Sequence, residues 1–307
     1  MTLLAVGTVA FDCVETPFGK RDDILGGSVS YLGTSASYFT NVRMMSVIGE
    51  DFPQGILDFF EQRDIDASGV KRIPGQTFRW RGRYTENLNE AQTLETQLNV
   101  LTDFDPKVPD AFLDSDYLVL GNISPDLQLN VLEQVKGAKL VACDTMNFWI
   151  DGALEDLKKT LKKVHLLSIN DGEARMLSGE HNLVKAAKAI QAMGPSILVI
   201  KRGEHGALCC TPEGMFAAPA MPLETIMDPT GAGDSFAGGL MGYIAQTGRW
   251  DLASLRQAVI LGSVMASFNV QDFSLDRLKS LSHDDIRRRY QDFAELTSFN
   301  ADFPNFW

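Results

Sequence analysis

Residues 227–240 read MDPTGAGDSFAGGL, in which two glycines flank an alanine and an aspartate follows at once. Gly231 and Gly233 allow the backbone to turn tightly with its amides pointing inward. The small and apolar residues from Asp234 onward are typical of a helix that ends at Gly248. A glycine-rich turn at a helix start presents unpaired N–H groups and the positive end of the helix dipole, so this stretch favours binding of an anion.

Asp234 places a negative carboxylate beside the predicted anion site. A carboxylate would repel an anion that rests there as a ligand. It can instead deprotonate a hydroxyl that attacks a phosphoryl group in transit, while the amides of Gly231, Ala232 and Gly233 stabilise the charge on the phosphate oxygens. The stretch therefore predicts phosphoryl transfer. The alternative interpretation is a tight turn in which Asp234 only caps the helix.

Composition limits the class of protein and its partners. The 307 residues contain 45% hydrophobic and 22% charged side chains, as expected for a globular chain with one large core. A net charge of −12 argues against nucleic acid and anionic membranes as partners. No apolar run approaches the roughly 18 residues that a membrane span needs. We expect a cytoplasmic protein whose four cysteines are reduced, namely Cys13, Cys143, Cys209 and Cys210.

Short apolar runs alternate with amphipathic stretches along most of the chain. Runs rich in Val, Ile and Leu predict strands that are buried on both faces, at residues 3–9, 44–49, 117–122, 139–145, 165–170 and 196–203. Patterns typical of helices lie at 28–39, 126–137, 181–194 and 283–296, and a hairpin pattern lies at 206–220. This alternation predicts an α/β fold with a central, mostly parallel sheet and helices on both faces.

Two regions interrupt the alternation and predict a small antiparallel sheet. Residues 12–27 are polar and irregular, and residues 70–103 contain the alternating runs TFRWRGRYTENL and TLETQLNVL. We expect these regions to form a lid over the site; the alternative is an edge hairpin without function. Arg79, Arg81 and Arg83 are spaced two apart, so on a strand they share one face. If that face looks into the site they favour an anionic substrate, and otherwise they are solubilising edge charges.

The residues around Asp234 also resemble a known family. DPTGAGDSFAGG at 228–239 resembles the C-terminal signature of the ribokinase (phosphofructokinase-B) family of carbohydrate kinases, and LGGSVSYLGTSA at 25–36 resembles its N-terminal signature. The resemblance covers nearly the whole chain in motif order and spacing. It implies a ribokinase-like fold, with residues 1–307 as a single kinase domain. It also implies transfer of the γ-phosphate of ATP, with Mg²⁺, to a hydroxyl of a small sugar or related polyol.

For the acceptor side, the resemblance implies that Asp234 is the catalytic base and that the three residues before it form the anion hole. Asp12 matches an aspartate that grips sugar hydroxyls, a role that suits a carboxylate because it accepts hydrogen bonds. The alternative for Asp12 is a turn-forming residue after a strand. The acceptor-binding residues that the resemblance implies are Asp12, Gly26, Gly27, Ser28 and Asp234.

For the nucleotide side, the ATP-binding residues that the resemblance implies are Asn170, Lys201, Gly203, Gly206, Gly231 and Gly233. Asn170 and Glu173 match a motif at the metal and phosphate end, with Glu173 acting on Mg²⁺ through water; the same spacing fits a capping box. Members of the family often bind a monovalent cation near the loop that holds Asp228, which implies a K⁺ site there. Asp144 and Asn147 resemble a stretch near the phosphates, but with an extra residue between them.

One departure from the family pattern leaves the acceptor open. Tyr31 stands where many relatives carry an asparagine that helps to bind the sugar, and an aromatic ring could stack on a base. The alternatives are therefore a nucleoside kinase with an adenosine- or inosine-like acceptor, and a non-catalytic sugar- or nucleotide-binding protein, which Asp234 argues against. A dinucleotide-dependent oxidoreductase is excluded because Phe236 occupies the third glycine position of its fingerprint. A homodimer through the lid is a further expectation from the resemblance.

Overall fold

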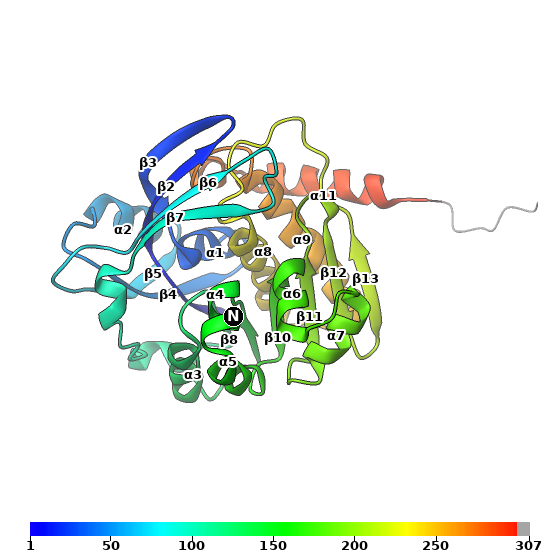
Figure 1. Ribbon diagram of the computed structural model, residues 1–307, viewed down its shortest axis with the longest axis horizontal. Helices are drawn as coiled ribbons and strands as arrows, with labels where there is room; N and C mark the ends of the chain where they lie inside the picture. The colour runs from blue at the N-terminus through cyan, green and yellow to red at the C-terminus, as the bar shows by residue number, and fades with distance from the viewer. Residues whose placement is uncertain (300–307) are drawn as a thin grey trace, which may run out of the picture.

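A nine-stranded sheet forms the centre of the computed structural model, which describes residues 1–299 (Figure 1). All strand pairs from β11 to β5 are parallel, and β12 and β13 add an antiparallel hairpin at one edge. From edge to edge the strands are β13 (Gly214–Ala218), β12 (Ala207–Thr211), β11 (Ile197–Lys201), β10 (Leu166–Asn170), β9 (Leu140–Cys143), β8 (Tyr117–Leu120), β1 (Thr2–Val6), β4 (Asn41–Ile48) and β5 (Ile65–Arg72). The predicted mostly parallel sheet is confirmed.

Helices cover both faces of this sheet, as its apolar strands predicted. Leu3 and Ala5 of β1 belong to one hydrophobic cluster, and the alternate residues Leu4 and Val6 belong to a second cluster on the opposite face. The first cluster lies against α1 (Ser28–Ala36), α2 (Gln54–Glu61), α8 (Ala232–Thr247), α9 (Leu252–Asn269), α10 (Asp276–Lys279) and α11 (His283–Thr297). The second lies against α3 (Pro125–Gln134), α4 (Asn147–Gly152), α5 (Leu154–Leu161), α6 (Asp171–Ser178) and α7 (Leu183–Gln191). Three short 3₁₀ helices are η1 (Asn99–Asp103), η2 (Asp110–Phe112) and η3 (Gly203–His205).

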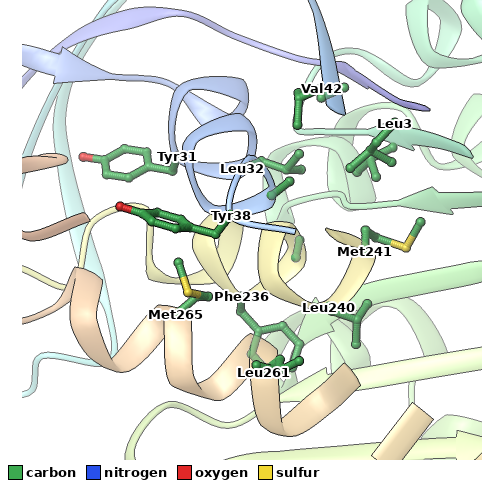
Figure 2. Packing of buried hydrophobic residues seen from close by; sticks show 14 of the residues in the cluster. Leu3, Tyr31, Leu32, Tyr38, Val42, Phe236, Leu240, Met241, Leu261 and Met265 are labelled. Carbon is green, nitrogen blue, oxygen red and sulfur yellow. The ribbon is translucent and has the colours of Figure 1, made fainter. Parts of the chain in front are cut away.

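Helix α8, which follows the glycine-rich turn, is enclosed between α1 and α9. A Cβ on Gly239 would lie 2.7 Å from the carbonyl oxygen of Leu261 in α9, and one on Gly238 would collide with the carbonyl oxygen of Leu32 in α1. Figure 2 shows Phe236 of α8 on the side of Leu261 and away from Leu32. Because glycines let three helices pack this closely, the start of α8 is held in a fixed place relative to the sheet.

The second sheet is small and has the strand order β3-β2-β6-β7. Its strands are β3 (Gly19–Gly26), β2 (Ala10–Thr16), β6 (Arg79–Tyr84) and β7 (Ala91–Gln97). The β2–β3 and β6–β7 pairs are antiparallel, and β2 pairs with β6 in parallel. The predicted bounds need correction: residues 10–16 and 19–26 are two regular strands joined by a turn, residues 65–72 belong to the large sheet, and residues 99–103 form η1. Residues 65–72 join the large sheet because they pair with β4 along its edge.

The arginines of β6 lie on the outer face of the small sheet. Gly82 and Tyr84 alternate with them and are buried. Each arginine also pairs with a carboxylate: Arg83 with Glu15 at 3.1 Å, Arg81 with Glu95 at 3.9 Å, and Arg79 with Asp23 and Asp51. The structure thus favours the interpretation of these arginines as edge charges.

The cysteine thiols are buried, except for the half-buried Cys13. All four cysteines are free. Burial raises the pKa of Cys210 to about 11 and that of Cys209 to about 12, so both thiols stay protonated at neutral pH. Within residues 1–299, no helix combines the length and the apolar character that crossing a membrane requires.

Candidate active site

The predicted site residues gather where the parallel strands of the large sheet end. Asn170 ends β10, Lys201 ends β11, and Asp144 follows directly after β9. The start of α8 brings Asp234 to the same edge, and β2 of the small sheet contributes Asp12 from the other side. Ligands of open α/β sheets bind at this edge, because the loops there are free to carry polar side chains.

The glycine-rich turn begins α8 slightly earlier than the sequence predicted. Gly231 has the left-handed angle φ 73° and precedes Ala232, the first residue of the helix, so Asp234 lies in the first turn. The N–H of Ala232 donates to the carbonyl of Pro229 at 3.1 Å and is therefore already used within the turn. Within residues 1–299, the amides of Gly231, Gly233 and Asp234 donate to no protein acceptor, so these three N–H groups remain for an anion.

Asp234 does not cap its helix. The acids at the equivalent position of two other helices, Glu173 in α6 and Asp285 in α11, reach back to the N-cap N–H in capping boxes. In the described part of the chain, the Asp234 carboxylate makes no hydrogen bond. Burial, followed by the charge of Asp144, raises the pKa of Asp234 to about 8, against the opposing effect of Lys201. The alternative of a purely capping aspartate is therefore not supported.

Lys201 is the cation of this cluster. Its Nζ lies 3.3 Å from Oδ2 of Asp144, and both side chains are mostly buried, with 17% and 11% of their surface exposed. A Cβ on Gly233 would lie 3.0 Å from the same Nζ, which places the lysine against the first turn of α8. Burial acts to lower the pKa of Lys201, but the charges of Asp144, Glu173 and Asp234 raise it. The side chain thus stays charged beside the unbonded amides.

The acceptor side centres on Asp12, which is 4% exposed. Burial, followed by the charge of Asp228, raises the pKa of Asp12 to about 8, while the backbone N–H of Gly27 acts to lower it. A Cβ on Gly26 would collide with the Asp12 carboxylate, and Gly27 has φ 88°, so both glycines are required by the local packing around Asp12. The hydroxyl of Ser28 is engaged with Thr8, which does not support its predicted contact with the acceptor.

Two tyrosines complete the acceptor side. The Tyr31 ring lies directly against Gly231, since a Cβ there would collide with the ring. Tyr84 of β6 is the phenol that sequence analysis missed: its hydroxyl accepts a hydrogen bond from Thr230 Oγ1 at 3.3 Å, and the charges of Asp228, Asp12 and Asp234 act on it. The sequence pattern could have identified Tyr84. Side chains alternate along a strand, so the spacing that places Arg79, Arg81 and Arg83 on one face of β6 places Tyr84 on the opposite face.

The nucleotide side shows the predicted capping box at the start of α6. The side chain of Asn170 accepts from the Glu173 N–H at 2.8 Å, and Glu173 Oε2 accepts from the Asn170 N–H at 2.7 Å. Burial, followed by the charge of Asp144, raises the pKa of Glu173 to about 7. No group of three or more His, Cys, Asp or Glu side chains within residues 1–299 is arranged to ligate a metal directly.

The remaining predicted nucleotide-side residues lie in turns. Gly203, with φ 51°, is the first residue of η3 between β11 and β12, and Gly206, with φ 81°, follows its last residue. Asn89, from the β6–β7 loop of the small sheet, accepts from the Glu204 N–H of this turn at 3.3 Å. Asn147 begins α4, and its side-chain oxygen accepts from the N–H of Phe148. The side-chain oxygen of Asn147, the residue preceded by the extra residue, is thus bonded within the first turn of α4.

Comparison with known proteins shows that this chain is similar to kinases in sequence and in structure. The sequence model of the family described as pfkB family carbohydrate kinase matches residues 29–279 of this chain. The cytidine kinase of Thermococcus kodakarensis is 32% identical over 79% of this chain and 88% of its own length. A ribokinase structure from Thermotoga maritima, 19% identical, superposes with a TM-score of 0.76 over 95% of this chain and 99% of its own. A nucleoside kinase structure from Burkholderia thailandensis, in complex with ADP-inosine and 18% identical, has a TM-score of 0.78 over 99% of this chain and 100% of its own.

Proposed function

The chain belongs to the pfkB family of carbohydrate kinases, and on that premise we propose that it transfers the γ-phosphate of ATP to a hydroxyl of a neutral ribosyl compound, with a nucleoside as the first candidate. The observation that carries the proposal is the half-buried Asp234 carboxylate, which has no hydrogen bond to any described residue and lies beside three unbonded amides and a charged lysine. A binding protein gains nothing from a carboxylate placed against phosphate, whereas a phosphotransferase needs a base there.

Each residue of the cluster has a role in this transfer. Asp234 takes the proton of the acceptor hydroxyl as its oxygen attacks the γ-phosphorus, and ADP leaves on the opposite side. A pKa of about 8 lies much nearer to neutral pH than that of an ordinary aspartate, so the ionised form of Asp234 is a stronger base. The amides of Gly231 and Gly233, with Lys201, stabilise the charge on the phosphate oxygens. Asp12 orients the acceptor, and the small sheet that carries it acts as a lid.

The nucleotide side supports a magnesium requirement. Asp144 and Glu173 supply the hard oxygen donors that Mg²⁺ takes in proteins. Since Glu173 Oε2 is already bonded within its capping box, its predicted contact through water fits the geometry. Bound with ATP, the metal would supply charge neutralisation at the phosphate oxygens.

A K⁺ site at Asp228 is the less supported part of the proposal. Asp228 is fully buried, and its oxygens accept from the N–H groups of Thr230 at 2.9 Å and Ser274 at 3.4 Å. These bonds support a role for Asp228 in holding the loop before α8. A cation would use the remaining lone pairs of the same oxygens.

The similarity to a cytidine kinase supports a nucleoside as acceptor over a free sugar. A panel of cytidine, inosine, ribose, fructose and fructose 6-phosphate, with coupled detection of ADP, tests this directly. We expect the highest kcat/KM on a nucleoside. Turnover of a free hexose alone would return the assignment to a sugar kinase, and no turnover of any acceptor would contradict the kinase proposal.

Substitution Asp234→Asn tests the base. We expect turnover to fall by at least about 100-fold, the usual scale for a positioned base, while ATP still binds with its normal affinity by calorimetry. Asp285→Asn is a matched control, because Asp285 occupies the same helix position in α11 but serves a capping box. The control should lose thermal stability and keep its turnover. Near-normal turnover in Asp234→Asn would remove this residue from its role.

A further inference from the structure

The hydroxyl of Tyr31 is buried without a partner. The residue is 1% exposed in α1, and its hydroxyl makes no hydrogen bond to any residue that the structure describes. Figure 2 shows the ring pointing away from Leu32 and Val42, so the hydroxyl leaves the apolar cluster rather than entering it. A buried phenol without a partner costs stability, and such a group in a site indicates that a bound molecule completes it.

The surroundings of this hydroxyl are the acceptor side of the site. The groups whose charges act on it are Asp12, Asp228, Tyr84 and Asp234. Burial, followed by these charges, raises the pKa of Tyr31 well above its ordinary value, so the phenol stays protonated and able to donate. Asp228 accepts from the N–H groups of Thr230 and Ser274, whereas no side chain of residues 1–299 donates to Asp12 or Asp234, so these two carboxyl groups are open to a bound molecule.

The charged groups of this region indicate which chemical group of a bound molecule would contact the Tyr31 hydroxyl. It must accept a hydrogen bond from a phenol and lie beside the carboxyl groups of Asp12 and Asp234, which only accept hydrogen bonds once they are ionised. A hydroxyl does both, because it accepts with its oxygen and donates with its hydrogen. A phosphate group on the acceptor would instead meet these carboxyl groups without a cation, because the arginines of β6 are held in ion pairs with other carboxylates and Lys201 lies beside Asp144 and the first turn of α8.

We propose that Tyr31 determines acceptor specificity: its hydroxyl donates to a sugar hydroxyl that in turn donates to Asp12, which selects a neutral ribosyl acceptor over a sugar phosphate. The inference rests on the proposed kinase function and names one further residue for it. The ring, stacked on Gly231, sets the distance between this contact and the phosphate-binding turn.

Substitution Tyr31→Phe with matched nucleosides tests the contact. The acceptors are cytidine, 2′-deoxycytidine and 3′-deoxycytidine, and both kcat/KM for the acceptor and KM for ATP are measured. On cytidine we expect the variant to lose about tenfold in kcat/KM, the scale of one neutral hydrogen bond, with KM for ATP unchanged. On the one analogue that lacks the bonded hydroxyl, wild type and variant should be equal, because the partner is already absent.

Tyr38→Phe is the control for removal of a buried tyrosine hydroxyl. Tyr38 lies just beyond the same helix, and its hydroxyl donates to the backbone carbonyl of Leu278 at 2.6 Å, away from the site. This variant should lose thermal stability and keep its kinetic constants.

The outcomes separate the inference from the proposed function. An equal loss on all three nucleosides, or a parallel rise in KM for ATP, would show that Tyr31 only supports the Gly231 turn, and would overturn the inference alone. An unchanged kcat/KM on cytidine would do the same. Wild-type turnover of fructose 6-phosphate with none of any nucleoside would overturn both the inference and the nucleoside proposal.

Discussion

Gly231 shows how one residue can be predicted from the sequence for one reason and required by the structure for two. The sequence asks for glycine because a tight turn precedes a helix, and the left-handed angle of 73° agrees. The second requirement is the Tyr31 ring, which occupies the space of a Cβ and comes from a helix two hundred residues earlier in the chain. No local pattern indicates that contact.

Substitution Gly231→Ala separates the two requirements when compared with Gly179→Ala. Gly179 has nearly the same φ of 72°, and a Cβ there meets nothing within 4 Å. We expect Gly179→Ala to cost about 1 kcal/mol in the free energy of unfolding, from backbone strain alone. Gly231→Ala should cost roughly 1–3 kcal/mol more, from overpacking against the ring, and should lower turnover. Equal losses in denaturant unfolding would mean that the ring moves aside freely.

At the scale of the element, the start of α6 combines a structural role with a proposed catalytic one. The Asn170–Glu173 pair forms a complete capping box, which the sequence predicted from spacing alone. Glu173 is also half-buried, and the charges of Asp144 and Lys201 act on it, an environment that capping does not require. The N-terminus of α6 thus brings the Glu173 carboxylate to the proposed phosphate-binding side of the site. Its neighbours Asp144 and Lys201 come from the ends of β9 and β11, which the strand order of the sheet places on either side of β10.

Substitution Glu173→Gln distinguishes these roles, because glutamine retains the capping geometry and removes the charge. We expect thermal stability to be kept, and the Mg²⁺ concentration for half-maximal activity to rise by about tenfold or more, as for other residues that act on a metal through water. Activity titrations with Mg²⁺ at saturating ATP measure this shift. An unchanged magnesium titration would leave Glu173 with its capping role only.

At the scale of the whole molecule, the fold holds several carboxylates together at a cost in stability. Burial raises the pKa of Asp12 and Asp234 to about 8 and that of Glu173 to about 7. The folded protein therefore retains protons that the unfolded chain releases near pH 4. Between about pH 4 and pH 8 the folded state binds more protons, so the free energy of unfolding falls as pH rises through this window.

We accordingly predict that the ligand-free protein unfolds at a lower temperature at pH 8.5 than at pH 5.5. The decrease should be about 3 °C or more, the effect of roughly 1 kcal/mol in a protein of this size. The double substitution Asp12→Asn/Asp234→Asn should flatten the dependence, because two of the titrating groups are then neutral at every pH. Calorimetry of both proteins across this range is the measurement, and identical slopes would contradict the assignment of the effect to these carboxylates.

The sequence by itself determined the parts of this protein that depend on local pattern. Apolar runs and periodicity predict the parallel sheet and its helices, and the motif around Asp234 indicates the start of α8 and the class of chemistry. The extent of the small sheet was predicted less well, because pairing with β2 and β4, rather than residue type, divides residues 65–97 between two sheets.

Only the tertiary structure decided which side chains meet. It pairs Lys201 with Asp144, turns the arginines of β6 outward and engages Ser28 with Thr8. Among residues 1–299 it also leaves the Tyr31 hydroxyl without a hydrogen-bond partner, in a region of carboxyl groups. These contacts join segments that are far apart in the chain, and their energies depend on burial and on distances between charges. A local pattern contains neither quantity, because both arise only when the strands and helices pack.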